Sequence, residues 1–367
     1  MNAIDQKVLQ DIQVMLEAHN RSTVVSDGFR FWIGLGEKHS AAIRKYGFAK
    51  FKRTINFEYS QWGVTTLNEP KTLRLVSLLL QKKNLPIETL AWMFSYTDEN
   101  LKGIENAIED IVWSDGIDVV TGQPHNASPI GGGDRFRAYA IYCTLLWQFA
   151  QTEDNLGCLE KVPEPAFGSP LPVPFQGRII SQDLALSSME LNRMASRIPM
   201  GKIRRVLEVG AGYGRLAFLF RKMFPDIEYT IIDIPPALAV SQNYLQNVLG
   251  PEAVAPYSEN PPLQDGAKIK FLLPSQVNKI PDGYFDLILN VSSFDEMKPE
   301  EVREYFNFIE RVGPGWLYVK GHGEIEKKGL RLGVNEFPYR PGWKEIYSGK
   351  DDVVPSFVEK IFRLRQP

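Results

Sequence analysis

The chain has 367 residues, of which 44% are hydrophobic and 23% charged, as in an ordinary globular protein long enough for two domains. A formal net charge of −2 excludes an overall positive field for nucleic acid, and no run approaches the roughly 20 apolar residues of a membrane span. Two cysteines and four histidines support neither a disulfide framework nor a zinc cluster, and no secretory signal is evident, so we expect a cytoplasmic protein.

The first half of the sequence has the apolar spacing of amphipathic helices. Four such stripes occur, at Ile4–Met15, Leu73–Leu80, Leu101–Ile111 and Phe136–Trp147. Stripes of this kind usually form a packed core. We therefore predict a mainly helical N-terminal domain over residues 1–175, which would select the acceptor, cover the active site or mediate oligomerisation.

The composition changes in the middle of the chain. Five prolines lie between Lys161 and Gly177, a density that excludes regular helix and central strand and predicts a connection between domains. After it, short β-rich runs alternate with helical patterns, which is typical of a parallel sheet with crossover helices. We predict a Rossmann-like α/β domain over residues 176–367. Seven strands are expected, at residues 205–209, 228–233, 268–272, 285–290, 315–320, 343–348 and 358–363.

The most informative motif joins the first of these strands to a helix. Within Val206–Arg215, Glu208 comes two residues before a turn that contains Gly210, Gly212 and Gly214. Glycines let the backbone adopt unusual dihedral angles and let a ligand approach it, and the amides of the next helix face that ligand. Dinucleotide sites use Gly-x-Gly-x-x-Gly around a pyrophosphate. S-adenosylmethionine has no pyrophosphate but carries an ammonium and a sulfonium, which a neighbouring carboxylate suits better.

A second acid ends the next predicted strand. Asp233 follows Gly212 by 21 residues, where a carboxylate can accept hydrogen bonds from both hydroxyls of a ribose. The alternative is a glycine turn used for packing and an Asp on the surface. The two motifs in sequence favour a site for an adenosyl sulfonium.

Three segments, 206–216, 229–245 and 285–297, resemble motifs of class I S-adenosylmethionine-dependent methyltransferases. Ile-Asp-Ile-Pro at 232–235 and the later 290–297 resemble bacterial sugar O-methyltransferases. The resemblance implies these cofactor-binding residues: Glu208, Gly210, Gly212, Gly214, Asp233, Ile234, Ser275, Gln276 and Asn290. Of these, Glu208 and the first two glycines would contact the methionine moiety. Ile234, Ser275 and Gln276 would contact the adenine, and Asn290 would lie near the reactive methyl group.

A sugar hydroxyl is a poor nucleophile, so a general base should assist its methylation. Ligands of open α/β sheets bind beyond the carboxyl ends of the strands, which points to His322, the one histidine of the second domain, and to Asp295 and Glu296. The alternatives are a solvated histidine and a Glu296 that stabilises the start of a helix near Pro299. Asp295 and Glu296 could also supply oxygen ligands to magnesium. No residues have dedicated metal-ligand spacing, so we expect catalysis without a metal.

These motifs predict an O-methyltransferase that acts on a sugar or glycan precursor. The alternatives are methylation of another small molecule or secondary metabolite, a non-catalytic scaffold that binds the cofactor, and a nucleotide-dependent oxidoreductase. The acceptor, the methylated position and the oligomeric state are left open.

Overall fold

The protein is described by a computed structural model, which covers residues 1–22, 27–54, 70–82, 84, 132–261, 263, 268–325 and 330–364. The chain forms two units, which we call the sheet unit (Met1–Ala41 with Arg193–Pro367) and the helical unit (Ala42–Asn192). This division differs from the expected border at residue 175. The first helices belong with the sheet, and the chain passes between the units within α10 (Gln182–Ala195).

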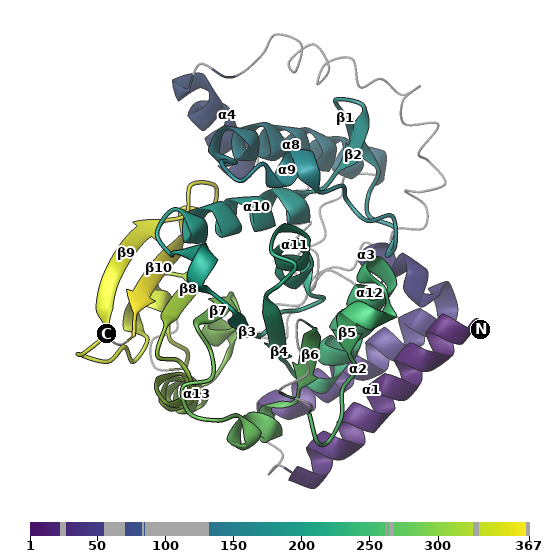
Figure 1. Ribbon diagram of the computed structural model, residues 1–367. Coiled ribbons are helices and arrows are strands. Elements are labelled where there is room, and N and C mark those ends of the chain that lie inside the picture. The colour runs from purple at the N-terminus through teal and green to yellow at the C-terminus, as the bar shows by residue number, and fades with distance from the viewer. Residues whose placement is uncertain are drawn as a thin grey trace. The chain divides into compact units, whose positions relative to one another are not determined.

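The sheet unit is built on a mixed sheet that has eight strands in the described part of the chain, in the order β5-β6-β4-β3-β7-β8-β10-β9 (Figure 1). In this order, each strand from β5 through β6, β4, β3 and β7 to β8 pairs in parallel with the next, and β10 is antiparallel to both of its neighbours. The strands are β3 (Arg205–Val209), β4 (Glu228–Ile232), β5 (Val254–Ala255), β6 (Ile269–Leu272), β7 (Leu287–Val291), β8 (Trp316–His322), β9 (Lys344–Lys350) and β10 (Phe357–Arg363).

All seven expected strands form, each within two residues of its expected bounds. The eighth, β5, has two residues, which is too short for a pattern in the sequence. Strands β3 and β4 are buried almost throughout, as expected for parallel strands that helices cover on both faces.

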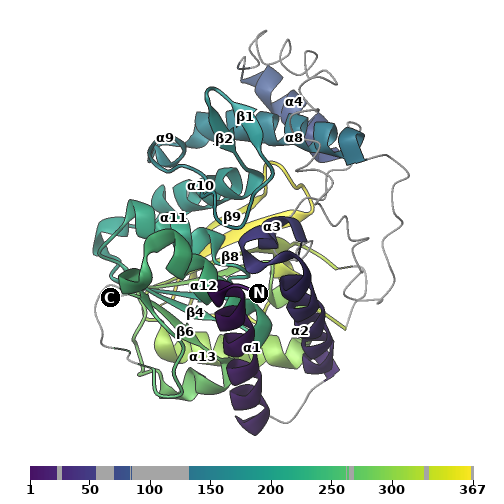
Figure 2. The same ribbon diagram turned by 90° about the vertical axis from the view of Figure 1, so that its right-hand side faces the viewer.

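Helices cover both faces of the sheet (Figure 2). On one face α11 (Arg215–Met223) packs its Phe220 ring on Tyr229 of β4, next to α12 (Pro235–Leu249). On the other face α13 (Pro299–Val312) contributes Phe306 and Ile309 to the apolar core. Short 3-10 helices complete the unit: η2 (Met200–Lys202), η3 (Pro251–Ala253), η4 (Pro274–Lys279), η5 (Phe294–Glu296) and η6 (Val334–Glu336).

The first helix of the chain, α1 (Ala3–Ser22), lies along α12 (Figures 1 and 2). The carboxylate of Asp11 accepts hydrogen bonds from Gln242 at 2.9 Å and from Asn243 at 2.7 Å. Residues 235–245 of α12 are buried on every side, so this helix needs a second layer besides the sheet. The α1 helix supplies that layer, and Gly36 of α2 (Asp27–Tyr46) lies so close to α12 that a Cβ there would be 2.9 Å from Pro236. These contacts explain why α1, and α2 as far as Ala41, belong to the sheet unit.

The buried faces of the helices agree only in part with the predicted apolar stripes. In α1 the predicted stripe is buried at Val8, Ile12 and Met15, whereas its first member, Ile4, is 37% exposed. In α4 (Pro70–Gln81) the predicted face was wrong, because Leu73 and Leu80 are 57% and 59% exposed while Leu75 and Leu79 are buried. Leucines occur on several sides of this helix, so spacing alone does not select its buried face. The stripe at 101–111 lies outside the described residues.

The described part of the helical unit also contains η1 (Phe48–Lys50), α3 (Phe51–Thr54), α8 (Gly132–Glu153) and α9 (Cys158–Lys161). The proline-rich segment lies inside this unit rather than between the units, and it contributes a β-hairpin of β1 (Val173–Phe175) and β2 (Arg178–Ile180). A buried ion pair of 2.7 Å joins Lys52 to Glu164. Among the described helices, none has the length and apolar character of a membrane span.

Candidate functional site

The chain order of the strands reverses at β3, which has β4 on one side and β7 on the other. In open α/β sheets ligands bind at such a switch point, outside the carboxyl ends of the strands. Gly210 follows β3 at this edge, Asp233 follows β4, and Asn290 lies at the end of β7. His322 ends β8, which runs parallel to β7.

The glycine turn has the conformation that its sequence predicts. Gly210, Gly212 and Gly214 have φ values of 74°, 59° and 88°, in the left-handed region that other residues rarely adopt. A Cβ on Gly210 would lie 2.2 Å from the hydroxyl oxygen of Ser293, and a Cβ on Gly214 would lie 2.8 Å from Leu245. The fold itself therefore requires glycine here, and cofactor contact by these glycines stays a prediction.

We expect Gly210→Ala to lower the free energy of unfolding by about 2–3 kcal/mol, because alanine combines left-handed strain with displacement of Ser293. Urea unfolding followed by circular dichroism measures the change. Gly201→Ala is the control, because a Cβ there meets no atom within 4 Å. Equal stability of the two variants would contradict the prediction.

Asn290 and Ser293 hold the end of β3. Asn290, which is 1% exposed, donates hydrogen bonds to the carbonyl oxygen of Val209 at 2.9 Å and to the hydroxyl of Ser293 at 2.5 Å. The Ser293 hydroxyl donates to the same carbonyl at 3.1 Å. Asn290 lies near the carboxyl end of β7, and its expected place beside the reactive methyl group stays a prediction. Its amide N–H groups, however, are directed to the protein, so the structure supports a role in positioning the glycine turn.

Asp233 joins the glycine turn to the end of β4. One carboxylate oxygen accepts the N–H of Gly212 at 3.0 Å, and the other accepts the N–H of Ile234 at 2.8 Å. Burial raises the pKa of Asp233 to about 7, although N–H groups of Ile234, Gly212 and Ala211 favour the ionised form. Because each carboxylate oxygen can accept two hydrogen bonds, acceptor capacity is left for a ligand.

Glu208, in β3 two residues before the glycine turn, is 3% exposed. The hydroxyl of Tyr229, from the neighbouring strand β4, donates a hydrogen bond of 2.7 Å to its carboxylate. This hydrogen bond restricts the orientation of the carboxylate. Sequence reasoning missed Tyr229, although the alternation of side chains along a strand places both residues on one face of the sheet.

Ser275 and Gln276 lie in η4, after β6. The side chain of Gln276 donates to the carbonyl oxygens of Ser258 and Glu259, at 2.8 and 3.1 Å, and accepts the N–H of Leu273 at 2.8 Å. Both of its amide hydrogens are therefore used within the protein. Ser275 is half-buried, and its contact with a ligand stays a prediction.

The loop after β7 brings Asp295 to the end of β8. Its carboxylate accepts the backbone N–H of His322 at 2.9 Å, and the missing side chain of Gly321 makes room for this contact. Burial raises the pKa of Asp295, whereas the hydrogen bond and the charge of His322 act in the opposite direction. Its other oxygen is buried and has no hydrogen-bond partner among the described residues. Glu296, the third candidate base, is exposed.

The His322 side chain is exposed at the carboxyl end of β8. We expected it in a loop, but β8 continues two residues beyond the predicted end. Its ring meets the Phe357 ring edge to face, with centroids 4.6 Å apart. The Asp295 carboxylate thus contacts the backbone of His322, not its ring. Which candidate residue acts as the base stays a prediction.

Two further features bear on the limits of the site. No group of three His, Cys, Asp or Glu side chains in the described part of the chain could hold a metal ion, and metal-independent catalysis stays a prediction.

A hollow of about 220 Å³ between Gly313, Arg340 and Trp343 lies before β8 begins. It is therefore at the opposite end of the strands from the candidate site.

No family model matches the sequence, and no curated protein matches it. Solved structures are similar to about half of the chain. A protein from Pyrococcus horikoshii OT3 is 15% identical over 47% of this chain and 90% of its own, with a TM-score of 0.35. Magnesium protoporphyrin IX methyltransferase from Synechocystis PCC 6803, solved with bound S-adenosylmethionine, is 14% identical over 50% and 83%, with a TM-score of 0.34.

An N-methyltransferase from Bradyrhizobium japonicum WM9, solved with S-adenosylhomocysteine, is 15% identical over 47% of this chain and 84% of its own. Its TM-score is 0.34. All three TM-scores are below 0.5, so we infer the function from the residues of this chain.

Proposed function

We propose that the chain is an S-adenosylmethionine-dependent methyltransferase. The observation that carries this proposal is the left-handed glycine turn at the switch point, joined to Asp233 by the hydrogen bond from Gly212. Glycine at 210, 212 and 214 lets the turn adopt left-handed dihedral angles and lets a ligand approach its backbone. The donor and acceptor groups around the turn fit an adenosyl amino acid.

Two carboxylates would hold the cofactor. Asp233 would accept hydrogen bonds from the ribose hydroxyls, and Glu208 would lie near the ammonium of the methionine moiety. Ile234 would pack on the adenine, and Ser275 would contact its edge. S-adenosylmethionine would supply a methyl group that its sulfonium activates, so the protein's task is alignment and exclusion of water.

The topology also weighs against the oxidoreductase alternative. The usual dinucleotide-binding sheet has the strand order 3-2-1-4-5-6 and is mostly parallel. Here β6-β4-β3-β7-β8 follow the first part of that order, but the next strand, β10, is antiparallel. The spacing Gly210-x-Gly212-x-Gly214 also lacks the third glycine position of the dinucleotide motif.

For the acceptor, we propose a hydroxyl of a sugar or glycan precursor, on the resemblance carried by 290–297. In this reaction the acceptor oxygen forms a bond to the methyl carbon as the carbon–sulfur bond breaks. His322, exposed at the end of β8, would take the hydroxyl proton, with Asp295 and Glu296 as rival bases. Another small molecule as acceptor is the alternative.

The proposal is tested by titrating the protein with S-adenosylhomocysteine and with NAD in a calorimeter. We expect binding of S-adenosylhomocysteine and none of NAD, and tighter binding of NAD would reject the methyltransferase. Radiolabelled methyl transfer to panels of sugars and of aromatic hydroxyl compounds then distinguishes the acceptors. Cofactor binding without transfer to any acceptor would favour the scaffold alternative.

The affinity for S-adenosylhomocysteine should rise with pH through about 7 and level off about one pH unit higher. Ribose hydroxyls need the ionised carboxylate, whereas burial raises the pKa of Asp233 to about 7 from its ordinary value of 3.8. Between these two values the folded protein binds one more proton than the unfolded chain, so this group lowers folding stability as pH rises there. Calorimetry from pH 5.5 to 8.5 measures the affinity. The same pH dependence in Asp233→Asn would contradict the assignment.

A further inference from the structure

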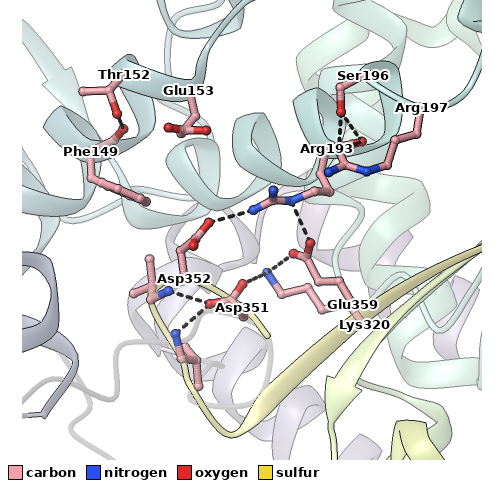
Figure 3. Close-up of polar contacts among 12 residues, drawn as sticks. Phe149, Thr152, Glu153, Arg193, Ser196, Arg197, Lys320, Asp351, Asp352 and Glu359 are labelled. Carbon is pink, nitrogen blue, oxygen red and sulfur yellow. Dashed lines mark hydrogen bonds and ion pairs between the residues drawn. The ribbon is translucent and has the colours of Figure 1, made fainter. Parts of the chain in front are cut away.

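A network of charged side chains joins α10, β8, β10 and the loop before β10 (Figure 3). The ammonium of Lys320, in β8, is 2.7 Å from the carboxylate of Asp351 and 3.4 Å from that of Glu359, in β10. Arg193 extends the network by donating to Glu359 at 3.0 Å and to Asp352 at 2.7 Å. We call these five residues the charge network.

The centre of the charge network is buried, since Lys320, Asp351 and Glu359 are each at most 5% exposed. Burial alone would raise the pKa of Asp351, but the Lys320 charge and two backbone N–H groups outweigh burial and lower it. Asp351 is therefore ionised at neutral pH. A buried ion pair is weak evidence for stability, because desolvation offsets the attraction. We therefore consider the local conformation that the Lys320–Asp351 ion pair fixes.

Asp351 holds the turn that leads into β10. The oxygen that does not face Lys320 accepts the N–H groups of Val353 and Val354, at 2.9 and 2.6 Å. The backbone N–H of Asp351 donates to the carbonyl oxygen of Phe357 at 2.9 Å, which closes the turn. The conformation of this turn thus depends on one carboxylate that Lys320 anchors.

The closing residue of this turn contacts His322. Phe357 is the pairing partner of His322 in the antiparallel β8–β10 ladder, and their rings meet at 71°. A further hydrogen bond of 2.8 Å, from the N–H of Gly323 to the carbonyl oxygen of Ser356, holds the turn against the end of β8. Lys320 and His322 are two residues apart in one strand, so they share a face of the sheet.

We infer that Asp351 is a positioning residue for His322, which it orients through the turn and the Phe357 ring. This inference rests on the proposed function, in which His322 is the general base. The Lys320–Asp351 pair fixes the turn, the turn fixes Phe357, and the Phe357 ring limits the orientations of the imidazole. A base must lie within hydrogen-bond reach of the proton that it removes, so its orientation affects the rate of the chemical step.

The test compares Asp351→Asn with Asp352→Asn. Asparagine at 351 keeps an oxygen for the two N–H groups but loses the charge that Lys320 anchors. Asp352 is the matched control, because it lies in the same loop and pairs with Arg193. The imidazole resonances of His322, identified by their absence in His322→Gln, are recorded by NMR in each variant.

We expect the His322 resonances to shift and broaden in Asp351→Asn and to stay unchanged in Asp352→Asn. With an acceptor found by the panel assay, kcat should fall about 10- to 100-fold in Asp351→Asn, because a misplaced catalytic group slows the chemical step. The KM for the acceptor and the affinity for S-adenosylhomocysteine should stay within twofold. Unchanged resonances and unchanged kcat in a folded Asp351→Asn protein would overturn the inference.

A second variant decides the matter if Asp351→Asn does not fold. Phe357→Leu keeps an apolar side chain but removes the ring. Because the lost ring current shifts the His322 resonances by itself, the expected result is broadened His322 resonances and a fall in kcat like that of Asp351→Asn. Phe224→Leu is its control, since Phe224 is also half-buried and packs against a neighbouring ring, that of Phe220. Sharp His322 resonances and unchanged kcat in Phe357→Leu would overturn the inference. Normal turnover of His322→Gln would instead reject His322 as the base, whatever the resonances show.

Discussion

Asp233→Ala should weaken the binding of S-adenosylhomocysteine about 5- to 150-fold, which corresponds to about 1–3 kcal/mol. The substitution removes the acceptor of the ribose hydroxyls. It also leaves the N–H groups of Gly212 and Ile234 without their carboxylate partner, which loosens the glycine turn. Both effects act on the adenosyl half of the ligand.

Calorimetry at pH 8, where Asp233 is mostly ionised, measures this loss. Asp226→Ala is the matched control, because Asp226 is exposed in the loop before β4. An Asp233→Ala protein that binds as tightly as the control would remove Asp233 from the site. The central support of the proposed function would then be lost.

His322→Ala should reduce turnover about 10²- to 10⁴-fold, the range expected when a general base is removed. The affinity for S-adenosylhomocysteine should be kept, because no proposed cofactor contact involves this side chain. Steady-state kinetics with the accepted substrate and calorimetry on the same preparations measure the two quantities separately.

Glu324→Ala is the control for this experiment, since Glu324 is exposed two residues further along the chain. Near-normal turnover of His322→Ala would transfer the role to Asp295 or Glu296. Asp295→Asn and Glu296→Gln distinguish these two. Asp295 is buried and accepts the backbone N–H of His322, so we expect Asp295→Asn to lower the stability of the folded protein as well. Glu296 is exposed, so we expect no such loss of stability in Glu296→Gln.

The positions of the strands and the glycine turn followed from the sequence, because each depends on a local pattern. The β3 strand has its expected bounds, Arg205–Val209, and it leads directly into a turn with three left-handed glycines. Burial on both faces makes such strands continuously apolar, and left-handed dihedrals select glycine. Both signals can be read from neighbouring residues.

Contacts between distant segments did not follow from the sequence. The buried face of α4 and the place of α1 against α12 depend on which surfaces remain to be covered once the sheet has formed. In the same way, Ser293 contacts Gly210 only because β7 lies beside β3. Polar residues of this kind have no spacing that a pattern could detect.

The sequence by itself thus determined an α/β sheet with a glycine turn and an acid at the ends of neighbouring strands. Only the tertiary structure decided that Tyr229 binds Glu208, that Asp295 contacts the His322 backbone, and that the turn at Asp351 ends against the His322 ring. Secondary structure and turns are selected by interactions along the chain. The surroundings of a site residue are selected by strand order, which brings together residues that lie far apart in the sequence.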